Sequence, residues 1–108
     1  MGEEAEIEDL FGELAERFLA DPGVTQGTGF GKKKGLRVSN KIFAIFGADD
    51  LTVKLPKARV DQLVEDGVGI RFDTGGGRIM KEWVTVPAEH RDDWAPLATE
   101  ALAFVRPA

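Results

Sequence analysis

The residues best suited to phosphate chemistry form a glycine-rich stretch that runs into three lysines. Gly27, Gly29 and Gly31 precede Lys32-Lys33-Lys34 and Gly35. In phosphate-binding loops, backbone N–H groups and a nearby lysine hold the anion. Two familiar spacings are not met here: Gly-x-Gly-x-x-Gly needs a third glycine at Lys34, and the Walker pattern needs a glycine at Gln26 and Ser or Thr at Lys33. We therefore interpret the stretch as a flexible turn.

Other polar groups lack the neighbours that catalysis or metal binding requires. Gly75-Gly76-Gly77 followed by Arg78 could hold an anion with backbone N–H groups, but a tight turn is the simpler interpretation. His90 is the single histidine, no ligand spacing surrounds it, and the single serine, Ser39, lies in a predicted turn. The chain contains no cysteine, which excludes disulfides and thiol nucleophiles. The sequence thus predicts no catalytic residue, no metal and no cofactor, and a protein that is not an enzyme.

Basic residues give the best candidate contact with an anion or a nucleic acid. They follow the glycine-rich stretch and continue into a predicted hairpin, with two more if these lie nearby: Lys32, Lys33, Lys34, Arg37, Lys41, Arg78 and Lys81. A basic loop leading into a β-ribbon can contact phosphates. The net charge of −5 argues against a dedicated nucleic-acid domain, because such domains are usually basic. Eight acids in residues 1–21 produce this balance, and they fit a solvated acidic helix.

The elements that must position these groups can be read from the hydrophobic spacing. Apolar residues recur with a helical period over residues 4–20, and three strands follow over residues 36–38, 41–46 and 51–55. A helix after Pro56, strands over residues 69–72 and 79–86, and a helix containing Trp94 complete the order; residues 24–26 could add a short strand. We expect one α+β domain over residues 1–108, a two-layer sandwich of order α-β(3)-α-β(2)-α with an antiparallel sheet. Residues 1–3 and 106–108 should fray.

Local signals fix several boundaries within this order. Ser39-Asn40 suits a two-residue hairpin turn, because asparagine tolerates positive φ. Gly67 is a credible C-terminal cap, and Pro96 is tolerated if Asp92 or Asp93 caps the last helix. Residues 88–91 could form a separate turn before it. Trp83 and Trp94, on a strand and a helix, are expected in the core.

The strand over residues 42–46 is apolar at every position, Ile-Phe-Ala-Ile-Phe. Side chains alternate between the two faces of a strand, so both faces of the sheet are apolar there. One face meets the helices, and the other needs cover from the first helix, a loop or a second subunit. We assign Ile42, Ala44 and Phe46 to a candidate interaction face for a homodimer or a protein partner.

Three stretches carry a resemblance that spans residues 36–105. They are Gly35-Leu36-Arg37-Val38-Ser39-Asn40-Lys41-Ile42-Phe43-Ala44, Leu51-Thr52-Val53-Lys54-Leu55-Pro56, and Gly77-Arg78-Ile79-Met80-Lys81-Glu82-Trp83-Val84-Thr85-Val86-Pro87. They resemble the N-terminal domain of the TfoX/Sxy proteins and the related MmcQ/YjbR-like small bacterial proteins, and the last stretch leans towards TfoX. The resemblance implies a bacterial source and a sandwich like that of secretion chaperones. It supplies no catalytic residues.

Together these features predict a small cytoplasmic protein. The chain has no apolar run of the roughly 20 residues that span a bilayer, and its start is acidic where a signal peptide is basic. We expect a non-enzymatic binding or protein-interaction module, with no membrane partner. The alternative is a nucleic-acid-binding accessory or transcription-regulatory protein that uses the basic loop and hairpin.

Overall fold

The computed structural model describes residues 2–27, 34–47, 49–73 and 79–107, with the backbone alone for residues 2–8, 73, 79 and 80. The elements follow the chain as helix α1 (Gly2–Leu19), strands β1 (Val24–Gln26), β2 (Lys34–Val38), β3 (Lys41–Phe46) and β4 (Asp50–Lys54), helix α2 (Lys57–Glu65), strands β5 (Ile70–Asp73) and β6 (Ile79–Pro87), the 3₁₀ helix η1 (Ala88–Asp93) and helix α3 (Trp94–Val105). This is the expected α+β order with one strand more than the five predicted, because the short segment β1 pairs with β2.

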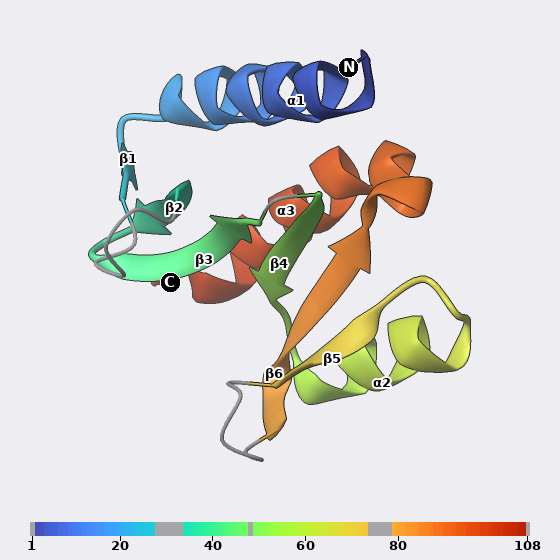
Figure 1. Cartoon of the computed structure of the whole chain (residues 1–108). Helices are drawn as coiled ribbons and strands as arrows, with labels where there is room; N and C mark the ends of the chain where they lie inside the picture. The colour runs from blue at the N-terminus through green and yellow to red at the C-terminus, as the bar shows by residue number, and fades with distance from the viewer. Residues whose placement is uncertain (1, 28–33, 48, 74–78, 108) are drawn as a thin grey trace.

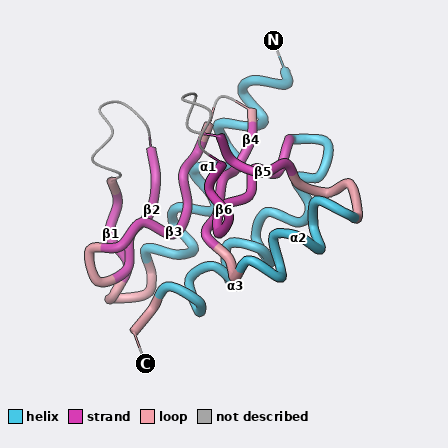
Figure 2. Tube along the Cα trace, turned by 90° about the horizontal axis from the view of Figure 1, so that it is seen from below, coloured by secondary structure: helices cyan, strands magenta, loops and turns pink. Residues whose placement is uncertain are grey.

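The described strands form one antiparallel sheet in the order β1-β2-β3-β4-β6-β5. Helices α2 and α3 lie along one face of this sheet, and α1 runs across one end of the molecule, at the top of Figure 1. Figure 2 shows the strands on one side and α2 and α3 on the other. The face that carries the helices is called the inner face below, and the opposite one the outer face.

The core fills the space between the inner face and the three helices. Helix α1 enters it through one stripe of side chains, because its buried residues recur at helical spacing: Phe11, Leu14, Ala15 and Phe18. The ring of Phe11 stacks on Phe46 of β3 and on Trp94 of α3, with ring centroids 4.7 and 5.2 Å apart. Phe18 meets Phe43 edge-on at 5.9 Å. Aromatic contacts therefore tie α1 to both the sheet and α3.

A β-bulge in β3 decides which of its side chains face the helices. Leu36 pairs with Ala44, but the next residue of β2 pairs with Ile42, so Phe43 is the extra residue. Ala44 and Phe46 belong to the buried core and are 0% and 6% exposed. The predicted interaction face of Ile42, Ala44 and Phe46 is therefore wrong: simple alternation does not hold across the bulge, and only Ile42 lies on the outer face.

Two predicted turn signals are confirmed. Ser39 and Asn40 have φ values of 51° and 66°, as a two-residue hairpin turn of type I′ requires. Gly67 has a φ of 76° just after α2. Its N–H donates to the Val64 carbonyl at 3.1 Å, and the N–H of Val68 donates to the Leu63 carbonyl at 3.0 Å. This pair of bonds is a Schellman motif, which ends α2 and turns the chain towards β5.

The start of α3 agrees with the sequence in position but not in mechanism. Asp93 occupies the N-cap without a side-chain hydrogen bond to the helix, and Pro96 falls in the first turn, where its missing N–H is harmless. The expected turn before the helix is η1. Trp94 is 1% exposed, and its indole N–H donates to the Val86 carbonyl at 3.0 Å. This bond fixes the start of α3 against β6.

Candidate interaction surface

The basic residues predicted to contact an anion do not form one group in the described part of the chain. Outside the described residues lie Lys32, Lys33 and Arg78. Lys34 begins β2 and Lys41 begins β3, so antiparallel pairing puts them at opposite ends of the hairpin. Lys81 is exposed on β6, which β3 and β4 separate from β2. The structure does not bring Lys34, Lys41 and Lys81 together.

Arg37, the remaining member of that set, makes a structural contact. It points to the outer face opposite Ile42, and it is half-buried. Its Nε donates to the Gly27 carbonyl oxygen at 3.0 Å, just beyond the end of β1. The guanidinium therefore holds the edge strand β1 against β2. The basic patch as a whole stays a prediction.

The middle of the outer face is largely closed to solvent. Ile45 points there, because it pairs with Gly35 and Thr52, and it is 8% exposed although it is not part of the core cluster. Thr52 is 5% exposed, and its hydroxyl shares a 2.8 Å hydrogen bond with that of Thr85 on β6. The buried Thr52 hydroxyl thus has a partner, as burial of a polar group requires. The centre of this face offers little apolar surface to a partner.

Accessible apolar surface on the outer face lies over β5 and β6. Ile70 of β5 is 62% exposed, and Phe72 and Trp83 are half-buried with ring centroids 6.5 Å apart. The ammonium of Lys54, on β4, lies 6.0 Å from the centroid of the Trp83 ring, within cation–π range. We call Ile70, Phe72, Trp83 and Lys54 the β5 patch. The prediction that Trp83 belongs to the core is wrong, whereas the same prediction for Trp94 is confirmed.

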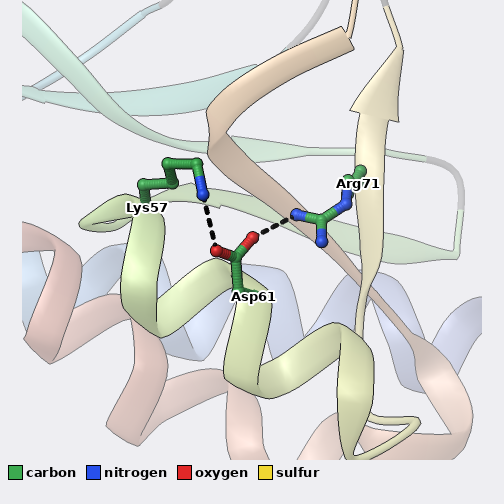
Figure 3. Close-up of polar contacts among 3 residues, drawn as sticks. All are labelled: Lys57, Asp61 and Arg71. Atoms are coloured by element: carbon green, nitrogen blue, oxygen red, sulfur yellow. Dashed lines mark hydrogen bonds and ion pairs between the residues drawn. The ribbon is translucent and has the colours of Figure 1, made fainter.

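Strand β5 is held in place from the inner face by an ion-pair network. Figure 3 shows Asp61 of α2 between Lys57 of the same helix and Arg71 of β5. Its two carboxylate oxygens lie 2.8 Å from Lys57 Nζ and 2.6 Å from an Arg71 guanidinium nitrogen. The hydrogen bonds from Lys57 and then Arg71 hold the pKa of Asp61 below its ordinary value. Ile70 pairs with Thr85, and the ring of Phe72 contacts that of Trp83, so both point to the outer face, opposite Arg71.

The two edges of the sheet differ in the side chains that they present. Strand β1 has three residues, two of which, Thr25 and Gln26, are polar and exposed. Short, polar edges resist the addition of another strand. At the other edge, no described strand lies beyond β5, and the exposed side chain next to that edge is Ile70. The β5 edge is therefore the one suited to strand addition.

A comparison with family models places the chain among known proteins. The YjbR model matches residues 19–102. The chain belongs to the YjbR family. Neither the curated proteins nor the solved structures yielded a match. The YjbR side of the resemblance seen in the sequence is confirmed, and the leaning towards TfoX stays a prediction.

The matched segment begins at the last residue of α1. Most of α1 in this YjbR chain therefore lies outside the family match, although its side chains complete the core.

The metal-binding and membrane-spanning features sought in the sequence can also be checked in the described part of the chain. Within the described residues, no three His, Asp or Glu side chains are grouped as metal ligands. His90 is half-buried in η1. None of the helices described here is long and apolar enough to cross a bilayer. The β5 patch carried no sequence motif, but the near-alternation of Ile70-Arg71-Phe72 was a signal that could have identified its outward side chains.

Proposed function

We propose that this YjbR-family chain is a non-enzymatic protein-interaction module, which binds an extended segment of a partner protein along the β5 edge. The observation that carries the proposal is Ile70, a large apolar side chain 62% exposed on an edge strand. A segment added as a further strand would form hydrogen bonds with the N–H and C=O groups along the edge of β5 and would cover Ile70. Fully burying such a side chain contributes about 1.5–3 kcal/mol.

The charges around the β5 patch favour an acidic partner over a basic one. Lys54 lies beside Trp83 on the outer face, and Lys81 is exposed on β6. In an added strand of alternating apolar and acidic residues, the apolar side chains would lie next to Ile70 on the outer face, and the carboxylates would point to the inner side, towards Arg71, which already binds Asp61. Lys54 and Lys81 would attract such an acidic segment through their positive charge, without contacting its carboxylates directly.

The proposal can be tested with a capped peptide of alternating valine and glutamate. Binding is followed by NMR through the two indole N–H signals, because Trp83 belongs to the patch and Trp94 is buried on the other face. We expect the Trp83 signal to move on titration and the Trp94 signal to stay. Replacing the central valine by proline should abolish binding, because proline donates no ladder hydrogen bond.

Matched variants localise the binding. Ile70→Glu should weaken the peptide about tenfold or more, whereas Phe104→Glu, the same type of change at a residue 40% exposed on α3, should leave it unchanged. Equal binding of the proline peptide, or equal weakening by both variants, would show that no strand is added at β5. Sedimentation equilibrium tests self-association through the same edge. A monomer at all concentrations would exclude the homodimer hypothesis.

The nucleic-acid alternative stays a prediction, as do a TfoX-like regulatory role and a cytoplasmic location. A DNA titration at low and high salt tests the first two, because phosphate contacts weaken as salt rises. A mobility shift at low salt that Lys33→Glu removes would support the basic loop. No shift at low salt would exclude it.

A further inference from the structure

A cleft between α1 and the junction of η1 with α3, called the α1–η1 cleft below, is lined by both apolar and charged side chains. It has a volume of about 380 Å³, within the range of small-molecule pockets, and its apolar lining is formed by Leu10, Leu14, Trp94 and Ala95. Leu14 and Trp94 are 8% and 1% exposed, so the walls behind the cleft are part of the packed core. This site lies away from the β5 patch and does not depend on the function proposed above.

Charged side chains of both signs line the cleft. Glu13 and Arg17 come from successive turns of α1, and Arg91 comes from η1. A second hollow of about 310 Å³ adjoins the first, because Leu10, Glu13 and Arg91 line both, and it adds Asp9. We call the first the inner hollow and the second the outer hollow. The inner hollow has two guanidiniums, Arg17 and Arg91, and one carboxylate, Glu13. The outer hollow has two carboxylates, Asp9 and Glu13, and one guanidinium, Arg91.

The arginines of the cleft are not neutralised by its acids. Among the described residues, neither Arg17 nor Arg91 forms an ion pair, and Arg91 donates a 3.2 Å hydrogen bond to the Ala88 carbonyl. By contrast, in the cleft between α2 and α3 the guanidinium of Arg59 already donates two hydrogen bonds to the carboxylate of Glu100. The α1–η1 cleft therefore keeps donors and acceptors free for a bound molecule.

We propose that this cleft binds a small zwitterion with an apolar body, of the class of free amino acids or dipeptides with apolar side chains. The carboxylate lies in the inner hollow with Arg17 and Arg91, and the ammonium lies in the outer hollow with Asp9 and Glu13. The apolar side chain packs on the half-buried Leu10 and Ala95, above the buried Leu14 and Trp94. A ligand with only a negative charge would be repelled by the two acids, and a ligand with only a positive charge would be repelled by the two arginines. A molecule that carries both charges therefore fits better.

The test is a titration of the full chain with leucine and with leucyl-leucine, followed by the Trp94 indole N–H signal. Trp83 serves as the internal reference because it lies on the outer face of the sheet. We expect saturable movement of Trp94 alone. N-acetylleucine and leucinamide, which keep one charge each, should bind about fivefold more weakly, the upper end of what a solvent-exposed ion pair contributes. Glycine, a zwitterion without an apolar body, should not bind.

Variants assign the two ends of the ligand. Arg17→Gln should remove the advantage of leucine over leucinamide, and Glu13→Gln its advantage over N-acetylleucine. Glu16→Gln, an exposed position on the same helix that does not line the cleft, should change neither. Equal affinity for leucine and leucinamide, or no movement of Trp94 up to the solubility limit of both zwitterions, would overturn the proposal. The single-charge ligands keep the test decisive even if one variant folds poorly.

Discussion

Replacing Phe11 by alanine should remove much of the stability of the domain. Its ring is 7% exposed and stacks on Phe46 and Trp94, with interplanar angles of 15° and 22°. A buried Phe→Ala change costs about 3–5 kcal/mol, a range that already includes the lost ring contacts, and the two stacked rings put Phe11 in the upper part of it. We therefore expect a loss of about 4–5 kcal/mol, against a total of about 5–15 kcal/mol for a domain of ordinary stability.

Urea unfolding followed by circular dichroism measures this loss. The slope of free energy against denaturant should stay constant, since the same surface is exposed on unfolding. Phe11→Leu keeps most of the apolar contact and should cost about 1–1.5 kcal/mol, so the test survives if the alanine variant does not fold. Glu16→Ala, on the exposed side of α1, should change stability by less than about 0.5 kcal/mol. A loss below about 1 kcal/mol for Phe11→Ala would refute the docking of α1 described here.

Two further predictions concern the attachment of β5. Gly69→Ala should cost about 1–3 kcal/mol in the same urea assay, because a Cβ at this buried position would collide with the Val84 side chain; an unchanged midpoint would contradict the packing of β5 on β6. The pKa of Asp61 is lowered by Lys57 and Arg71, so its contribution is present above its ordinary value of 3.8 and is lost as pH falls through the lowered pKa. The stability difference between the wild type and Asp61→Asn should therefore be constant near neutral pH and shrink below about pH 4; a difference that grows on acidification would contradict the network.

The features that the sequence predicted well depend on neighbours along the chain. The turn at Ser39-Asn40 and the cap at Gly67 follow from backbone preferences of single residues, and both were found as expected. The stripe of α1 follows from the helical period, and Phe11, Leu14 and Phe18 are buried accordingly. In each case the deciding interaction is local or periodic, so one sequence is enough to specify it.

The features that it missed depend on how strands meet. Nothing in Ile42-Phe43-Ala44-Ile45-Phe46 marks Phe43 as a bulged residue, so alternation assigned Ala44 and Phe46 to the wrong face. Trp83 was expected inside because aromatic residues usually are, but the inner side of β6 is taken by Val84 and Val86. The β5 patch exists because β5 ends the sheet, and strand order is a long-range property. Similarly, the α1–η1 cleft joins segments far apart in sequence.

The strand order also has a consequence for how the chain folds. Four of the five strand pairings join strands that follow each other in sequence, and these can form as hairpins with short closing loops. The pairing of β4 with β6 is the exception, because it brings Lys54 and Trp83 together across α2 and β5. Closing that loop costs the most chain entropy before any contact repays it. We therefore expect the β4–β6 pairing to be the late, rate-limiting contact, with β1–β4 and the α2–β5–β6 segment as two early halves that meet there.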